Sequence, residues 1–200
     1  EILFNGTADS MRRRILKPLK EGLSTFHERK TNNVKLLDIA TGSGRTLKQL
    51  RASFPKNKIL GLDLSDSYLK EASRYIADLE GDLIELIKAN AESLPFEDNS
   101  LQAISCVYLF HELPRTVREK VLREIFRVLE PGGVLVLADS IQINDSPKFI
   151  SIMEGFYKNF HEPFYCDYIK DDIDTKMSEI GFNNINSKSF FMTKVWSAIK

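Results

Sequence analysis

The sequence lacks three features that define large classes of proteins. It has only two cysteines in 200 residues, and Cys106 and Cys166 lie too far apart for a disulfide framework or a usual metal spacing. Its 28 basic and 28 acidic residues cancel, which argues against nucleic acid or an anionic membrane as a partner. No apolar run approaches the roughly twenty residues of a membrane span, and no signal peptide is recognisable. These absences predict a cytoplasmic protein from a reducing compartment.

The residues that are present suffice for one hydrophobic core. Hydrophobic side chains make up 42% of the chain and aromatic ones 10%, and a chain of this length usually forms one domain. We therefore predict a single domain over residues 1–200, with an N-terminal helical segment over 1–30 and an aromatic insertion over 142–170. The chain begins with Glu1 rather than Met, which indicates truncation, and Arg12, Arg13 and Arg14 form a local basic stretch.

Short apolar runs alternate with helical patterns, which is typical of βαβ units around a parallel sheet. The predicted strands cover residues 34–40, 59–64, 83–89, 101–110 and 133–141. Three helices are predicted between them. Pro55 ends the first, Ser65 caps the second and Gly81 closes it, and a Pro-Gly-Gly stretch at 131–133 ends the third.

The two ends of the chain differ from this alternation. Residues 9–28 predict a helix laid over the sheet, and a second helix is expected at 171–180, after the insertion. Two final β runs flank a predicted turn at residues 192–194. Such a short connection makes the last two strands antiparallel.

A glycine turn at the end of the first strand is the strongest functional signal. In "LLDIATGSGRTLKQL", an apolar strand runs through Gly42 and Gly44 directly into a helix. Glycine has no Cβ and tolerates positive φ, so backbone amides and the helix N-terminus can approach a ligand closely. In open α/β sheets, ligands bind at this carboxyl edge of the strands.

Two carboxylates specify the ligand further. The second predicted strand ends in Asp63, nineteen residues after Gly44, where a carboxylate can accept hydrogen bonds from both ribose hydroxyls. Leu47 stands where dinucleotide sites usually have a third glycine, so the nicotinamide pattern is incomplete. Asp38 lies before the turn, where it suits a cationic amino group and would repel a pyrophosphate. A nucleoside that carries an amino acid fits both acids.

Four stretches in order, "LLDIATGSGRTLKQL", "ILGLDLSDSYLKEA", "IKANAESLPFEDNSLQAISCVYLFHELP" and "EIFRVLEPGGVLVLADS", resemble the class I S-adenosylmethionine-dependent methyltransferases. The resemblance covers residues 34–141 and is greatest to the branch that includes the ubiquinone and menaquinone C-methyltransferases. It implies a three-layer αβα sandwich with a mostly parallel, Rossmann-like sheet of seven strands. The implied strand order is 3-2-1-4-5-7-6, with an antiparallel last strand.

The resemblance also implies which residues bind the cofactor, S-adenosyl-L-methionine, and its product, S-adenosyl-L-homocysteine. Asp38 and the backbone of the turn would hold the methionine part, Asp63 the ribose, and Leu64 would pack against adenine. The turn consists of Ala40, Thr41, Gly42, Ser43 and Gly44. Asn90 and Ala91 match the family's Asp-Ala step at the adenine edge, and Tyr108 begins the segment beneath the sulfonium. Ala40-Thr41, Ser43 and Asn90 are small departures from the family pattern.

Each of these residues also has a purely structural interpretation. Asp63 could cap the following helix, and Asn90 could begin a short helix in which Glu92 interacts with the helix dipole. His111 and Glu112 could face a substrate, or His111 could be bonded to backbone at a strand exit. His161 lies among aromatic residues that form either a lid over the acceptor or a satellite cluster. The two His-Glu pairs are fifty positions apart in the sequence, so we predict no metal site.

The predicted activity is methyl transfer to a small, partly apolar molecule. Such a displacement depends largely on positioning, and an acceptor that must lose a proton would also need a base. His111, His161 and Tyr108 are the candidate catalytic residues. Two alternatives remain: another nucleoside-using enzyme, for aminopropyl or hydride transfer, and a non-catalytic protein that binds S-adenosylmethionine. The sequence does not specify the acceptor or the oligomeric state.

Overall fold

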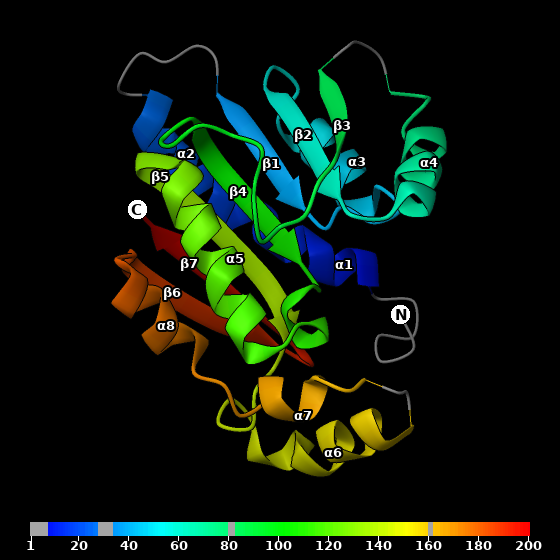
Figure 1. Ribbon diagram of the computed structural model, residues 1–200, viewed down its shortest axis with the longest axis vertical. Helices are drawn as coiled ribbons and strands as arrows, with labels where there is room; N and C mark the ends of the chain where they lie inside the picture. The colour runs from blue at the N-terminus through cyan, green and yellow to red at the C-terminus, as the bar shows by residue number, and fades with distance from the viewer. Residues whose placement is uncertain (1–7, 28–33, 80–82, 160–161) are drawn as a thin grey trace.

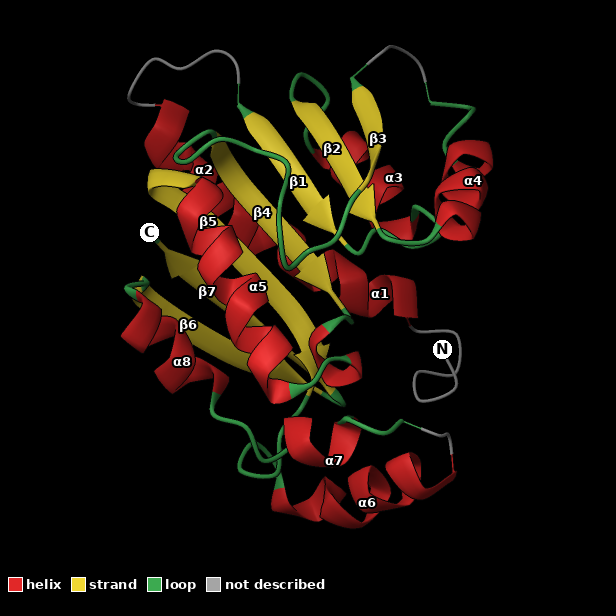
Figure 2. Ribbon diagram, viewed as in Figure 1, coloured by secondary structure: helices red, strands yellow, loops and turns green. Residues whose placement is uncertain are grey.

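A seven-stranded sheet runs through the computed structural model, which describes residues 8–27, 34–79, 83–159 and 162–200 (Figures 1 and 2). The strand order is β3-β2-β1-β4-β5-β7-β6. Neighbours from β3 to β5 are parallel, whereas β7 is antiparallel to both β5 and β6. The predicted order and the antiparallel last strand are confirmed. The strands are β1 (Lys35–Ile39), β2 (Lys58–Asp63), β3 (Ile84–Lys88), β4 (Leu101–Val107), β5 (Leu129–Ser140), β6 (Asn183–Phe190) and β7 (Thr193–Ile199).

Helices cover both faces of this sheet. Helices α5 and α8 lie in front of it in the view of Figure 1, and α2 and α3 lie behind. The α-helices are α1 (Ala8–Arg12), α2 (Leu16–His27), α3 (Arg45–Ser53), α4 (Asp66–Tyr75), α5 (Arg115–Val128), α6 (Ile150–Asn159), α7 (Tyr165–Tyr168) and α8 (Ile173–Ile180). Short 3-10 helices are η2 (Arg13–Ile15), η3 (Phe110–Glu112) and η4 (Pro147–Phe149). Among the described residues, none of these helices has the length and apolar character needed to cross a membrane.

The core divides into two layers because successive residues of a strand point to opposite faces. Leu36 of β1 belongs to the cluster that packs against α2 and α3, whereas its neighbour Leu37 belongs to the cluster beneath α5 and α8. Both side chains are fully buried. A strand buried on both faces is expected to be largely apolar. β1, β4 and β5 show this pattern with a few polar interruptions, such as Asp38 and Ser105.

Helix α3 packs closely on β2 through a glycine of the strand. A Cβ built on Gly61 would lie 2.8 Å from Cδ1 of Leu47. Leu47 is the residue that replaces the third glycine of a dinucleotide site. The close helix–strand approach is thus kept, but the small residue stands on the strand instead of the helix.

Several predicted boundaries are wrong by a few residues. Strand β4 ends at Val107, because Tyr108 has a φ of 58° and leaves the extended conformation. Strand β5 begins at Leu129, which pairs with Leu101, instead of after the glycines. The final turn lies at residues 191–192, since Thr193 already pairs with Phe190.

Two predicted helices also differ from the observed ones. The N-terminal helix is interrupted by the 3-10 turn η2. Helix α4 begins after Ser65, whose hydroxyl accepts a 3.3 Å hydrogen bond from the amide of Tyr68, so the predicted cap is confirmed. It ends at Tyr75, sooner than predicted, and Gly81 lies outside the described residues.

Helix α2 approaches β5 at Gly22, which gives a test of the packing. A Cβ on Gly22 would lie 2.6 Å from Cγ2 and 2.7 Å from Cβ of Val134, a branched side chain that cannot move aside. We expect Gly22→Ala to lower the free energy of unfolding by about 1–2 kcal/mol, because overpacking costs about 1–3 kcal/mol and exceeds the gain in helix propensity.

Gly155→Ala is the matched control, because nothing lies within 4 Å of the corresponding Cβ in α6. It should raise the free energy of unfolding by about 0.5–1 kcal/mol through helix propensity alone. Urea denaturation of both variants measures the difference. Equal effects of the two substitutions would contradict the packing of α2 on β5.

Candidate active site

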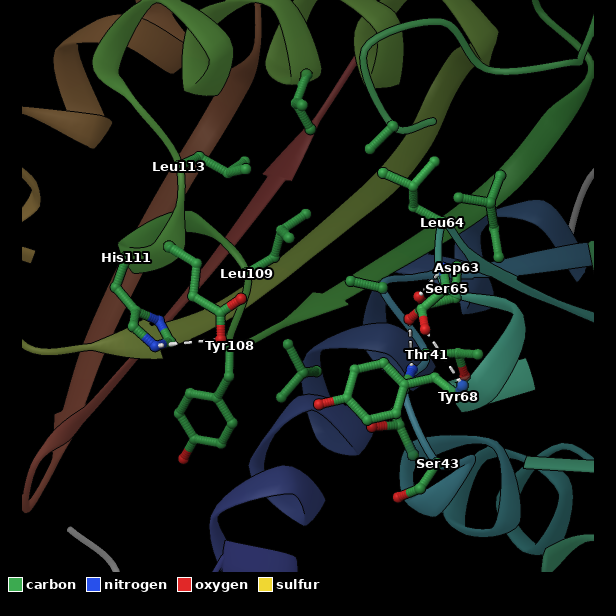
Figure 3. A pocket seen from close by; sticks show the side chains of 18 of the residues that line it. Thr41, Ser43, Asp63, Leu64, Ser65, Tyr68, Tyr108, Leu109, His111 and Leu113 are labelled. Carbon is green, nitrogen blue, oxygen red and sulfur yellow. Dashed lines mark hydrogen bonds and ion pairs between the residues drawn. The ribbon is translucent and has the colours of Figure 1, made fainter. Parts of the chain in front are cut away.

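A cleft of about 780 Å³ opens at the carboxyl ends of β1, β2 and β4. Its volume lies within the range of small-molecule sites. Figure 3 shows two groups of labelled side chains facing each other across it. Thr41, Ser43, Asp63, Leu64, Ser65 and Tyr68 form one side, and Tyr108, Leu109, His111 and Leu113 form the other.

The turn after β1 presents bare backbone to this cleft. Ala40, Gly42 and Gly44 have φ angles of 54°, 53° and 82°, which is a region that side chains with a Cβ rarely adopt. A Cβ on Gly42 would meet nothing within 4 Å, so the space beside it is open to a ligand. A Cβ on Gly44 would lie 3.2 Å from the backbone of Ala72 in α4. Gly42 therefore leaves room for a ligand, whereas Gly44 leaves room for a helix.

Asp63 joins the turns that follow β1 and β2. Its Oδ2 accepts a 2.8 Å hydrogen bond from the amide of Gly42, and its Oδ1 accepts one of 2.9 Å from the amide of Ser65. The residue is 8% exposed and lines the cleft. Each carboxylate oxygen has two lone pairs, so both oxygens keep an acceptor site for a ligand hydroxyl.

Asp38 lies beneath the turn and does not line the cleft. Its two oxygens accept hydrogen bonds from the hydroxyls of Thr41, at 2.8 Å, and Ser105, at 2.7 Å. Burial raises the pKa of Asp38 to about 6, and the two hydroxyl contacts oppose that rise. Asp38 thus orients Thr41, which does line the cleft. Asp38 would therefore influence a ligand indirectly, through the position of the Thr41 side chain.

Two exposed side chains line the cleft beside Asp63. Leu64 and Tyr68 are 64% and 53% exposed, a large fraction for apolar side chains, and both line the cleft beside Asp63. Asn90 and Ala91 line the same cleft, and Oδ1 of Asn90 accepts a 2.9 Å hydrogen bond from the amide of Glu92. This bond leaves the side-chain amide of Asn90 as a donor.

Tyr108 is held in a fixed orientation. Its hydroxyl shares a 2.7 Å hydrogen bond with Oγ1 of Thr193 on β7, and the guanidinium carbon of Arg12 lies 5.6 Å from its ring centre. Burial raises the pKa of Tyr108 to about 12. At neutral pH this hydroxyl is therefore un-ionised, and the side chain presents chiefly its ring to the cleft.

His111 forms a buried ion pair with Asp139, a residue that the sequence analysis did not single out. Nδ1 of His111 lies 2.7 Å from Oδ1 of Asp139. Asp139 is fully buried and also accepts hydrogen bonds of 2.7 Å from the amides of Phe110 and Ser140. Burial disfavours the charged imidazole, but Asp139, with smaller contributions from Glu112 and Glu162, outweighs this effect and raises the pKa of His111 to about 9.

The aromatic insertion reaches the same side of the cleft. Phe156 and Glu162 line it, but Tyr165 and Tyr168 are buried. The hydroxyls of both tyrosines bond to Ser140 at 2.6 Å, to its side chain and its carbonyl oxygen respectively. Helix α7 is therefore anchored to the end of β5. His161 lies outside the described residues.

The structure thus brings most of the predicted residues together. Eleven positions were predicted to bind the cofactor, and all of them except Asp38 and Gly44 line the cleft. His111 and Tyr108 lie on its other side. Arg12, Arg45 and Phe156 also line it and were not predicted as site residues. Asp139 had a visible signal, because it ends an apolar run in the same way as Asp38 and Asp63.

The chain is similar in sequence to known methyltransferases. Residues 36–133 match the family model described as a methyltransferase domain. The chain is 32% identical over 163 residues to a demethylmenaquinone methyltransferase of Thermotoga maritima, an alignment that covers 82% of this chain and 64% of that protein. It is 29% identical over 172 residues to a ubiquinone/menaquinone biosynthesis C-methyltransferase of Cronobacter sakazakii, covering 76% and 67%. The chain therefore spans about two thirds of the length of these relatives.

The fold is also that of solved methyltransferases. Phosphoethanolamine N-methyltransferase 2 of Haemonchus contortus, in complex with S-adenosyl-L-methionine, superposes with a TM-score of 0.68 at 14% identity, over 90% of this chain and 52% of that one. These matches in sequence and in fold confirm the predicted resemblance to the class I S-adenosylmethionine-dependent methyltransferases. The two curated relatives extend this similarity to the predicted branch of the ubiquinone and menaquinone C-methyltransferases.

The His111–Asp139 pair predicts a pH dependence of stability. The pKa of His111 rises from 6.5 to about 9 on folding, so its stabilising effect is complete below pH 6.5 and is lost as the pH rises through 9. The loss should amount to roughly 3 kcal/mol. Asp38 titrates in a separate window below about pH 6.

Urea denaturation at pH 6, 7.5, 9 and 10 measures this effect, and His111→Gln is the control. The wild-type free energy of unfolding should fall across this range, and the variant should lose most of the slope. A wild-type curve parallel to that of His111→Gln would show that the ion pair does not form.

Proposed function

We propose that this chain transfers a methyl group from S-adenosyl-L-methionine to a small, partly apolar acceptor. The observation that carries the proposal is the joining of the bare turn at Gly42 to Asp63, beside the exposed side chains of Leu64 and Tyr68. The first pair suits an amino-acid chain and a ribose, and the second pair suits a flat base. S-adenosyl-L-methionine supplies an electrophilic methyl group on a sulfonium.

The residues fit this ligand by their chemistry. Asp63 would accept the ribose hydroxyls with the lone pairs that the amides of Gly42 and Ser65 leave free. The side-chain amide of Asn90 would bind the adenine edge, and Thr41, fixed by Asp38, would bind the methionine part. The bare backbone at Gly42 admits a ligand where a Cβ would otherwise project.

The opposite side of the cleft suits an acceptor with an apolar body. Leu109, Leu113 and Phe156 supply apolar surface, while His111 and Glu112 supply polar groups. Sites for small molecules combine these features. The segment 142–170 would cover this end, since Phe156 and Glu162 belong to it. Relatives named for demethylmenaquinone and for ubiquinone and menaquinone biosynthesis favour a quinol-type ring as the acceptor.

Removal of the predicted ribose contact tests the binding part of the proposal. We expect Asp63→Ala to weaken the binding of S-adenosyl-L-homocysteine at least tenfold in calorimetric titration, because hydrogen bonds to a charged group contribute about 1.5–3 kcal/mol each. Asp66→Ala, which removes an exposed acid of the same turn outside the cleft, is the control. An unchanged Kd in the folded Asp63 variant would refute the assignment.

Methyl transfer itself is tested with tritiated S-adenosyl-L-methionine and reduced demethylmenaquinone, and then with other quinols and phenols. We expect label in the acceptor at a rate that depends on Asp63. NAD should displace no bound S-adenosyl-L-homocysteine, and displacement would favour a nicotinamide-dependent enzyme. Tight binding of S-adenosyl-L-homocysteine without methylation of any acceptor would favour the non-catalytic alternative.

A further inference from the structure

We propose that Asp139 is the positioning residue of the methyl-acceptor site, acting through His111. This inference rests on the proposed function and adds a residue that does not line the cleft. Asp139 is the last residue but one of β5, and His111 lies in η3 after β4, so the pair connects two adjacent strands at the carboxyl edge of the sheet. The contact between Nδ1 and Oδ1 is 2.7 Å.

The bonds to Asp139 determine which nitrogen of His111 faces the acceptor. Oδ2 of Asp139 is bonded to the amide of Phe110, and Oδ1 to the amide of Ser140 and to Nδ1 of His111. Because a carboxylate accepts and does not donate, Nδ1 must carry the proton. In the neutral imidazole, Nε2 is then the proton acceptor, and His111 lines the cleft.

Packing fixes the imidazole plane as well as its tautomer. The rings of Tyr165 and Tyr168 lie edge-on to His111, at centroid distances of 6.1 and 6.3 Å. Both tyrosines are bonded to Ser140, the neighbour of Asp139. Two residues at the end of β5 therefore fix the position of His111. Asp139 bonds to its ring directly, and Ser140 anchors the two tyrosines of α7 that pack against that ring.

The other charged groups near His111 are Glu112, of the same 3-10 helix, and Glu162, which precedes α7. Oε1 of Glu112 lies 3.9 Å from Nε2 of His111, and both acids favour the protonated imidazole. Glu112 is 59% exposed at its side chain, whereas Asp139 is fully buried. Asp139 is thus the one of the three that is shielded from water and bonded to a ring nitrogen.

The chemical step follows from this geometry. Nε2 of His111 takes the proton of the acceptor group, and the acceptor atom forms the new bond to the methyl carbon. The electron pair of the broken sulfur–carbon bond stays on sulfur, and Asp139 stabilises the imidazolium that results. A positioned base of this kind contributes about 10²–10⁴-fold to a rate, so Asp139 acts by orientation and charge without touching the acceptor.

A double-mutant cycle tests the inference with labelled methyl transfer to reduced demethylmenaquinone as the readout. We expect Asp139→Asn to lower kcat at least a hundredfold, with little change in the Kd of S-adenosyl-L-homocysteine. In the His111→Gln background, the same substitution should change kcat less than threefold, because residues that act as a unit are non-additive. Asp145→Asn is the control, since this half-buried acid bonds to the amide of Gln142 and to Lys194 and not to His111.

The pH dependence provides a second readout. Wild-type kcat should rise with pH and level off above an apparent pKa near 9, and the NMR titration of His111 should give the same pKa. Asp139→Asn should move the pKa of the kcat profile and the pKa of His111 towards 6.5. Equal losses from Asp139→Asn in the two backgrounds would overturn the inference, as would a His111 titration that moves without a change in kcat. Failure of wild-type binding or methyl transfer would instead overturn the proposed function.

Discussion

The arrangement of the cleft depends on one carboxylate, that of Asp63. It accepts the amide of Gly42 from the turn after β1 and the amide of Ser65 from the turn after β2. These two turns carry the bare backbone and the exposed surface of Leu64 and Tyr68. Without the carboxylate, two partly buried amides would lose their acceptor, and the cost of an unpaired polar group reaches about 1–3 kcal/mol where it is fully buried. The same atoms that fix the turns therefore define the site.

Buried acids at strand ends recur around this edge of the sheet. Asp38 lies one residue before the end of β1 and holds Thr41. Asp63 ends β2 and holds Gly42, and Asp139 near the end of β5 holds His111. In each case the carboxylate orders a neighbouring segment that faces the cleft. Parallel strands allow several such carboxylates to face one cleft, because the carboxyl ends of the strands all lie at one edge of the sheet.

The sequence predicts the fold well because its signals are redundant. Apolar runs, the Ser65 cap and four ordered motifs all indicate the same sheet, and the strand order is confirmed. Boundaries were less predictable. Leu129 continues the apolar stripe of α5 and also starts β5, so helical periodicity alone could not separate the two. Strand β4 ends sooner than predicted because Tyr108 has a positive φ, a backbone conformation that no sequence pattern indicates.

The site was predictable wherever backbone chemistry requires a particular residue type. Gly42 and Asp63 belong to this group. The pairing of His111 with Asp139 was not predictable, because it depends on the register between β4 and β5, and a single sequence does not determine that register. Asp38 illustrates the opposite case, because its charge was visible but its burial beneath Thr41 was not.

The most direct test of the central claim is a crystal structure of the chain with S-adenosyl-L-homocysteine. We predict that both ribose hydroxyls lie within hydrogen-bonding distance of the Asp63 carboxylate, with Gly42 beside the amino-acid chain. A ligand bound elsewhere, or a ribose that does not contact Asp63, would contradict the claim.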